Sequence, residues 1–330
     1  MKSLKKLIAL VLATALILTS GMVSYAYTPG EIDSKINDTA SYIIKNVQEP
    51  ALGSIGGEWA VIGLARGKAK VPDKYYEKYY KGIEEHVKQN KGILHKKKYT
   101  DYSRVILALT AIGKNPENVA GYNLLENLGD FEKTVWQGIN GPVFALIALD
   151  SNNYKIPENK TAKIQATREL YIKDILKRQL SDGGFALTGD KADTDITAMA
   201  LQALSKYQSN KEVKVATTKA LDCLSKLQKS NGGYDSWGTE NLESTAQVAT
   251  ALCELGIDVN DKRFVKNGNT LIDNMLTYYT KNGFIHTKDG SGNSGMATEQ
   301  ALYTLVNYQR ISKGQLSLYR MTDVKTNSIK

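Results

Sequence analysis

Acidic residues recur at the starts of short apolar segments in this 330-residue chain. Asp193, Asp195 and Glu243 are the most suggestive, because glycoside hydrolysis needs two carboxylates that face each other across one cavity. Acids at helix starts also cap the helix and complement its dipole. Capping is therefore the favoured role for any single acid, and these three are the candidate catalytic residues if the chain is an enzyme.

The segments that hold these acids repeat along the chain. A small residue followed by leucine recurs at Gly63-Leu64, Ala108-Leu109, Ala145-Leu146, Ala200-Leu201, Ala251-Leu252 and Ala301-Leu302. Each pair lies in a short helix-like segment that is apolar nearly all round, so each segment must be buried on most faces. Longer amphipathic helices are expected between them, over about 31–47, 72–90, 118–128, 158–180, 211–229 and 262–281. We predict an all-α fold, an (α/α)6 toroid of six helix pairs around one central cavity.

Glycine-aromatic joints connect an outer helix to the next inner one. They read Asp182-Gly-Gly-Phe185, Asn231-Gly-Gly-Tyr234 and Asn282-Gly-Phe284. Glycine can end a helix, and the aromatic ring that follows can fill the gap between adjacent pairs. Gln179 and Gln228 stand four residues before the first glycine of their joints, where their amides can bridge loop backbone to the next helix.

The Gln-x-x-x-Gly-Gly-aromatic pattern at 179–185 and 228–234, with the stretch 193–201, resembles the prenyltransferase and squalene-oxidase repeat of terpenoid cyclase-like toroids. The stretches 231–240 and 295–302 are similar to exported repeat-containing proteins of Gram-positive bacteria. The resemblance covers about residues 31–310 and implies the toroid. It does not settle the chemistry, because the superfamily hosts unrelated functions that include cobalamin carriage.

Three activities that the resemblance implies each require residues that this chain does not have. Cyclases use Asp-x-Asp-Asp-Thr-Ala, and Ile196 replaces the last Asp, which leaves Asp195 without a partner to keep a proton poised. Prenyltransferases hold zinc with Asp, Cys and His, but Asp195 stands in the Cys position and the three histidines lack metal-ligand spacing, so no metal site is predicted. Met296 replaces the nucleophile of the thioester motif.

In a toroid, all six inner helices start at the same end, which we call the mouth. Carboxylates, amides, one Arg and two Trp gather there and suit a polar ligand. Trp59 and Trp136 either stack on a ligand ring or pack between repeats. The candidate ligand-binding residues are Glu58, Trp59, Asp101, Arg104, Trp136, Gln137, Asn140, Tyr234, Asp235, Gln247, Thr298 and Glu299.

These observations favour an exported binding module that holds a small polar ligand, either a cobalamin-like molecule or a glycan, and that requires no cofactor. One alternative is a secreted enzyme, cyclase-like or glycan-cleaving, that uses the acids at the mouth. Another is a surface interaction protein with a vestigial cavity.

The N-terminus predicts export. Lys2, Lys5 and Lys6 precede an apolar run from Leu7 to Leu18, and Ser24-Tyr25-Ala26 has the small residues of a cleavage site. We assign 1–26 to a signal peptide, 27–310 to the toroid and 311–330 to a C-terminal tail. The mature protein is expected to be secreted or associated with the cell surface, and not integral to the membrane.

Charge and cysteine content fit this assignment. The net charge is +9, and subtracting the three lysines of the signal peptide leaves about +6. The lysines are scattered apart from Lys96-Lys97-Lys98, so nucleic acid is not an expected partner. Cys223 and Cys253 are predicted as two buried free thiols rather than a disulfide, because a core of this size needs no covalent staple.

Overall fold

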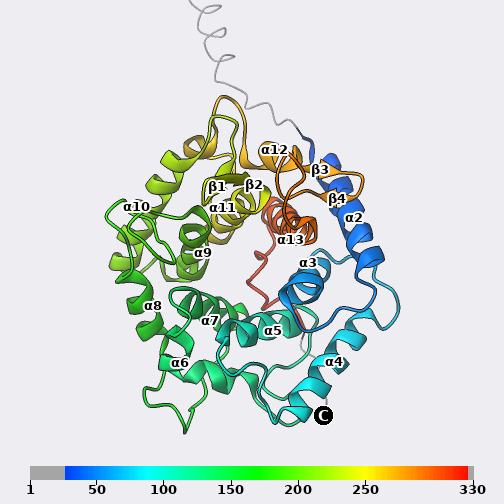
Figure 1. Ribbon diagram of the computed structural model, residues 1–330, viewed down its shortest axis with the longest axis vertical. Coiled ribbons are helices and arrows are strands. Elements are labelled where there is room, and N and C mark those ends of the chain that lie inside the picture. The colour runs from blue at the N-terminus through cyan, green and yellow to red at the C-terminus, as the bar shows by residue number, and fades with distance from the viewer. Residues whose placement is uncertain (1–26, 326–330) are drawn as a thin grey trace, which may run out of the picture.

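The computed structural model describes residues 27–325, which form two concentric rings of helices (Figure 1). The outer helices are α2 (Pro29–Asn46), α4 (Tyr75–Gln89), α6 (Phe131–Val135), α8 (Arg168–Leu176), α10 (Lys211–Leu227) and α12 (Leu271–Leu276). The inner helices are α3 (Trp59–Arg66), α5 (Tyr99–Ala111), α7 (Asn140–Ser151), α9 (Thr194–Leu204), α11 (Leu242–Leu255) and α13 (Ser294–Ser312). Each inner helix packs on the next, and α13 packs on α3. The predicted (α/α)6 toroid is therefore confirmed.

Three outer helices are shorter than the periodicity predicts. Residues 118–128 were expected to be helical, but the third outer element is a 3-10 helix at Leu124–Gly129 followed by α6. Helix α8 begins only after Thr167, whose side chain caps the first turn, and α12 begins only after Thr270, which forms a capping box with Asp273. Capping residues thus end the preceding loops later than the apolar spacing indicates.

Two short antiparallel hairpins occupy the outer-to-inner connections of the last two repeats. One pairs β1 (Tyr234–Ser236) with β2 (Thr239–Asn241), and the other pairs β3 (Tyr279–Thr280) with β4 (Gly283–Phe284). The turn of the first hairpin is Trp237-Gly238, and both residues have positive φ. Such values suit a tight hairpin turn but are unusual for a bulky residue such as Trp.

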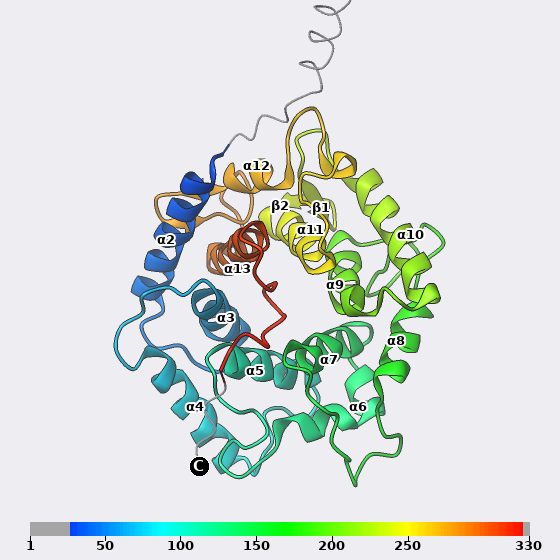
Figure 2. The same cartoon turned by 180° about the vertical axis from the view of Figure 1, so that it is seen from behind.

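The C-terminal segment crosses the face of the ring opposite the mouth, which we call the base. Figure 2 shows it, in red, running from α13 across the middle of the ring. Asp323 pairs with Arg66 at 2.8 Å and with Arg310 at 2.6 Å. Glu254 accepts hydrogen bonds from the Ser317 hydroxyl and from the backbone of the segment. This tail therefore belongs to the packed structure of the ring.

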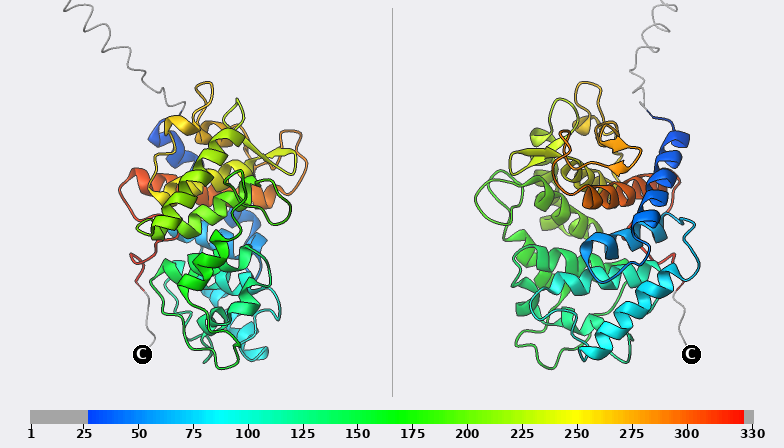
Figure 3. Two further views of the ribbon diagram at one scale, coloured as in Figure 1. Left: turned by 90° about the vertical axis from the view of Figure 1, so that its left-hand side faces the viewer. Right: turned by 45° about the vertical axis from the view of Figure 1, so that its right-hand side comes forward.

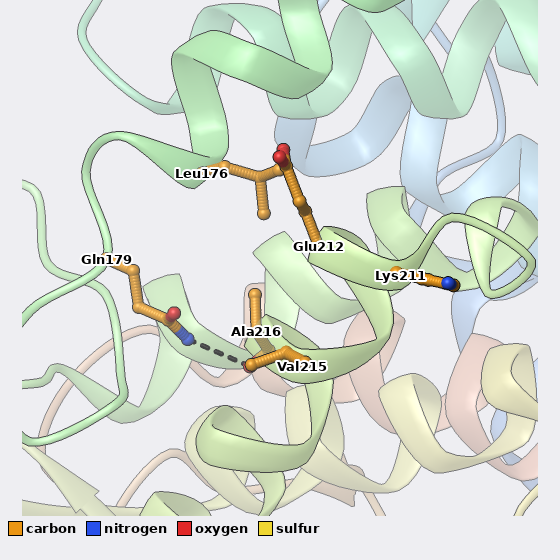
Figure 4. Close-up of a pocket in the computed structure, with 6 residues that line it drawn as sticks. All are labelled: Leu176, Gln179, Lys211, Glu212, Val215 and Ala216. Carbon is orange, nitrogen blue, oxygen red and sulfur yellow. Dashed lines mark hydrogen bonds between the residues drawn. The ribbon is translucent and has the colours of Figure 1, made fainter.

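The glycine-aromatic joints form as predicted. Phe185, Tyr234 and Phe284 are fully buried, and the backbone N–H of each donates to a threonine hydroxyl of the following inner helix. The Gln179 amide donates to Gly183 O and to Ala216 O of α10, each at 2.8 Å. Figure 4 shows this side chain at a surface pocket of about 350 Å³ between α8 and α10.

Gln228 repeats this arrangement one pair later. Its amide donates to Gly232 O at 2.9 Å and to Phe264 O at 2.8 Å. The expectation that both glutamines bridge joint backbone to the next outer element is confirmed. The two glutamines that stand at the same distance before each joint in the sequence are thus the residues that connect neighbouring repeats in the structure.

Replacing Gln228 by Met should destabilise the fold by about 2 kcal/mol, because the substitution leaves two buried carbonyls without their donor. Urea unfolding measures the change. Gln48→Met, at an exposed position, is the control and should shift the free energy of unfolding by less than about 0.5 kcal/mol. Equal unfolding midpoints for the two variants would show that the bridge contributes nothing.

Cys223 and Cys253 are buried and free, as predicted. The predicted signal peptide, residues 1–26, lies outside the described residues. Between residues 27 and 325, no helix combines the length and the apolar character that a membrane span requires.

Candidate functional site

The starts of the inner helices define the mouth of the ring. In the side views of Figure 3, the loops that precede α9, α11 and α13 project on one face, and the red tail lies on the other. Three mouth acids that sequence analysis grouped as catalytic candidates sit on neighbouring helices: Asp193 and Asp195 at the start of α9, and Glu243 in the first turn of α11. Their surroundings give them different roles.

Asp193 is the N-cap of α9. Its Oδ1 accepts the Ile196 N–H at 2.9 Å, and its Oδ2 accepts the Ser236 hydroxyl at 2.6 Å. Both oxygens are occupied, so this carboxylate fixes the helix start and the β1–β2 hairpin. The capping role that residue type favours is the one that the structure gives to Asp193.

Asp195 is held in its neutral form to unusually high pH. Burial, followed by the negative charges of Asp193 and Glu243, raises the pKa of Asp195 to about 7. Its Oδ1 is enclosed, and neither this oxygen nor the neighbouring Ser244 hydroxyl has a hydrogen bond of normal geometry within the described part of the chain. The Ser244 hydroxyl nevertheless lies close enough to oppose the rise in the pKa of Asp195. Ile196 replaces the third Asp of the cyclase motif, but Asp195 is not left without a neighbouring negative charge. Glu243, on the next inner helix, supplies one and so helps keep Asp195 protonated.

Glu243 is paired with a histidine. Its Oε2 lies 2.7 Å from His286 Nδ1, and burial raises the pKa of Glu243. Its Oε1 is buried without a partner among residues 27–325. His286 comes from the loop after β4, where its ring packs on Gly292, at which any Cβ would stand 2.1 Å from His286 Cδ2.

Sequence analysis missed His286 as a site residue. It lies in a loop 43 residues after Glu243, and it was considered only for metal binding. Repeat alignment offers one signal: Asp193-x-Asp195-x-Thr197 and Asn241-x-Glu243-x-Thr245 match position by position, which marks Asp195 and Glu243 as equivalent. Nothing in the spacing points to the histidine.

Tyr303 lies among the mouth acids. Its hydroxyl accepts the Gln247 amide at 2.8 Å and donates to Gln300 Oε1 at 3.1 Å. Burial raises the pKa of Tyr303, and the charges of Glu243, Asp195 and Glu299 raise it further. Gln247 in turn accepts the Gln202 amide at 2.9 Å. These amides and the phenol form a hydrogen-bonded layer at the centre of the ring.

A second acidic group lies on the α3 and α5 side of the mouth. Glu58 is fully buried and accepts from Gly53 N, from the Tyr79 hydroxyl and from Arg104 Nε. Arg104 also donates to Asp101 at 2.6 Å. Burial raises the pKa of Glu58 to about 7. This group is internally satisfied and braces the start of α5 against α3.

Glu299, at the start of α13, is only half satisfied. Its Oε1 accepts the Gly56 N–H at 2.7 Å, and its buried Oε2 has no partner in the described chain. Burial, followed by the nearby charge of Glu58, raises the pKa of Glu299 to about 7. This oxygen is a further buried acceptor near the mouth.

Four of the remaining candidate residues make structural contacts. Tyr234 is buried and donates to Leu224 O, and Thr298 bonds the backbone of Phe284. Trp59 packs against Phe144 and Tyr303 at 6.0 and 5.6 Å between ring centroids. Asp235 pairs with Lys229 at 3.0 Å.

The other three lie at the start of α7. Trp136 is 64% exposed. Gln137 bonds the first turn of α5 through Thr100, and Asn140, the first residue of α7, is partly exposed. The candidates are thus divided between the acids of α9, α11 and α13, the Glu58 group, and this aromatic segment. Across residues 27–325, no group of three or more His, Cys, Asp or Glu side chains could hold a metal ion.

The raised pKa values predict how stability depends on pH. An acid whose pKa is higher in the folded chain than in the unfolded chain stabilises the fold fully at low pH, and this stabilisation is lost as pH rises. For Asp195, Glu58 and Glu299, the loss runs from about pH 4 to the folded value of about 7. The melting temperature should therefore fall by several degrees between pH 5 and pH 8.

Glu299→Gln is the matched variant, because the amide oxygen can still accept the Gly56 N–H. Its melting temperature should fall less than that of the wild type over the same range. The acids with lowered pKa values, such as Asp261 and Asp289, titrate below this range and do not confuse the comparison. A wild-type melting temperature that rises from pH 5 to pH 8 would contradict the assignment.

No protein-family model and no curated protein sequence matches the chain. Its structure is similar to the unsaturated glucuronyl hydrolase of Bacillus sp. GL1, responsible for the degradation of glycosaminoglycan: 12% of residues are identical, 89% of this chain and 99% of that chain are covered, and the TM-score is 0.58. A UGL variant with dGlcA-Glc-Rha-Glc has 11% identity, the same coverage and the same TM-score. At this identity the similarity establishes the α/α toroid that the chain shares with these glycan-active proteins.

Proposed function

We propose that this chain is an exported glycan-active hydrolase in which Asp195 is the general acid. The observation that carries the proposal is a carboxylic acid with a pKa of about 7 whose enclosed oxygen has no partner among the described residues. General acids in hydrolases are kept protonated near neutral pH by burial and by neighbouring carboxylates. Asp195 has both features, and it lies at the mouth of the ring.

Glu243 is the partner carboxylate in this proposal. It differs from Asp195 because His286 holds one of its oxygens at 2.7 Å and the other is free. Asp195 would protonate the oxygen of the leaving sugar, while Glu243 would take a proton from the attacking water. Burial raises the pKa of both acids, but the hydrogen bond from His286 opposes that rise at Glu243. Two acids in different surroundings are the pattern of acid–base pairs.

The fold neighbours support this reading over a binding module. One is an enzyme that degrades glycosaminoglycan, and the other carries a sugar chain. The enclosed oxygens of Asp195, Glu243 and Glu299 have no hydrogen-bond partner among the described residues. Buried acceptors are normally paired with a donor, and a sugar hydroxyl that entered the mouth would supply one. A retained ligand, glycan or cobalamin-like, would supply donors as well, and the test must separate turnover from retention.

Incubating residues 27–330 with saturated and 4,5-unsaturated uronate oligosaccharides tests the proposal, with native mass spectrometry as the readout. Both kinds are included because a neutral carboxylic acid can protonate either a leaving oxygen or a carbon–carbon double bond. Products that together gain the mass of one water per cut support the hydrolase. An intact oligosaccharide or corrinoid that stays bound in equimolar amount supports the binding module instead.

A further inference from the structure

The connections that open onto the mouth carry exposed apolar side chains. Ile55, Ile93, Trp136, Leu187 and Trp237 are all exposed, and each lies between an outer helix and the next inner one. Two of these side chains, Ile93 and Trp136, lie beside Lys96-Lys97-Lys98, the only run of lysines within residues 27–325. We call Ile93, Lys96, Lys97, Lys98 and Trp136 the basic-aromatic rim.

The two segments of the rim are held in register. Lys97 Nζ lies 5.6 Å from the centre of the Trp136 ring, within the range of a cation–π contact. The residue after Trp136, Gln137, accepts the Thr100 N–H at 3.0 Å and donates to the Thr100 hydroxyl at 3.3 Å. Tryptophan and lysines therefore keep a fixed relation although they come from different repeats.

His95 fixes the lysine run itself. Its Nδ1 accepts the backbone N–H groups of Lys97 at 3.0 Å and of Lys98 at 2.8 Å. All three lysine side chains remain exposed. A surface whose backbone is already ordered loses less entropy when it binds, so this run differs from the scattered lysines on the rest of the chain.

The rim continues toward the proposed catalytic acid. Leu187 Cδ1 would stand 3.5 Å from a Cβ at Gly138, so the loop before α9 packs beside the Trp136 segment. Asp195 follows in the first turn of α9. A glycan bound along the rim would therefore extend onto the loop that leads into α9.

We propose that the basic-aromatic rim is a binding site for an anionic glycan chain. Trp136 stacks under a sugar ring, and the lysines pair with carboxylates on the sugars to either side. This inference rests on the proposed function in one respect, which is that the bound glycan is delivered to Asp195. An anionic glycan fits better than nucleic acid, because proteins that bind duplex DNA tightly make about 6–10 phosphate contacts and the rim offers three lysines.

Binding of an oligogalacturonate tests the rim in the Asp195→Asn background, where turnover cannot remove the ligand. At about 0.1 M ionic strength, replacing the three lysines by Gln should weaken binding roughly tenfold, and Trp136→Ala should do the same. The methyl-esterified oligosaccharide has the same sugar faces without the charges. For this ligand, the lysine substitutions should not change the affinity, whereas Trp136→Ala should still weaken binding.

Matched controls lie elsewhere on the ring. Lys211, Lys214 and Lys219 are exposed on outer helix α10, and replacing them by Gln changes the net charge equally but should leave the affinity unchanged. Trp237→Ala removes a tryptophan that is 80% exposed on another repeat and should have less effect than Trp136→Ala. Equal losses from rim and control variants would overturn the proposal.

Two further ligands test the chemical class. Single-stranded oligonucleotides of matched charge, or vesicles with anionic lipid, would overturn the proposal if they bound the rim more tightly than the uronate chain. The result of this binding test can be distinguished from the result of the hydrolysis test for the proposed function. Rim-dependent binding without hydrolysis by the wild type would refute catalysis and leave the glycan site standing.

Discussion

Asp195→Asn is expected to lower kcat for glycan hydrolysis by about 10²- to 10⁴-fold, which is the usual contribution of a general acid. The amide has nearly the same shape as the carboxyl group but cannot deliver the acidic proton. Wild-type activity should also decline above about pH 7, as the raised pKa of Asp195 is passed. Initial rates from pH 5 to pH 9 on the oligosaccharide that is cleaved would measure both effects.

Asp193→Asn is the matched control, two residues away on the same helix. Asn is as good an N-cap as Asp, and Asp193 uses both oxygens in structural bonds. Its activity near pH 5 should stay within a few-fold of the wild type, and its decline should begin at a lower pH, because the charge of Asp193 helps raise the pKa of Asp195. Equal losses in the two variants, or an Asp195→Asn enzyme with full activity, would refute the role of Asp195 as the acid.

Arg66→Met is expected to cost about 3–5 kcal/mol of unfolding free energy, the range for breaking a buried, hydrogen-bonded charge pair. The Arg66 side chain is only 3% exposed. It donates to Leu318 O, Ser317 O and Arg320 O of the tail as well as to Asp323. The substitution removes the donor of the three tail carbonyls, while Asp323 keeps its pair with Arg310, so the tail should detach from the base before the rest of the ring unfolds.

Urea unfolding measures the loss, and limited proteolysis reports whether cleavage begins after α13. Lys78→Met removes an exposed pair with Glu49, and it should change stability by less than about 1 kcal/mol. If Arg66→Met behaved like Lys78→Met, the tail would not be a structural part of the base.

The fold was predictable because its signals are local and repeated. The small-residue–Leu pairs marked six inner helices, and the Gln179 and Gln228 joints could be assigned bridging roles from their spacing alone. The outer helices were less predictable. Thr167 and Thr270 begin α8 and α12 later than the apolar spacing indicates, because side-chain caps compete with periodicity for where a helix starts.

The candidate site was predictable only in part. Repeat position identifies Asp195 and Glu243 as equivalent acids, but protonation depends on burial and on charges from neighbouring helices. Ile196 removes a carboxylate from the same helix as Asp195, but Glu243 supplies a negative charge from the next inner helix. His286 reaches Glu243 from a loop whose course depends on β3–β4 and on Gly292, and such a contact has no signature in spacing.

The contact between α3 and α13 also limits how this architecture can change. Arg310, in the last inner helix, donates a hydrogen bond to the backbone oxygen of Arg66, in the first inner helix, 244 residues away in the chain. The ring therefore closes only when α13 packs against α3. An open solenoid can gain or lose a unit at either end, because each unit depends only on its neighbours. Here a deleted or duplicated unit would separate α3 from α13 and displace the C-terminal segment from its arginines. A change in the number of units would therefore require new closure contacts between the first and the last inner helix, whereas a change in a loop at the mouth would leave the closure contacts in place.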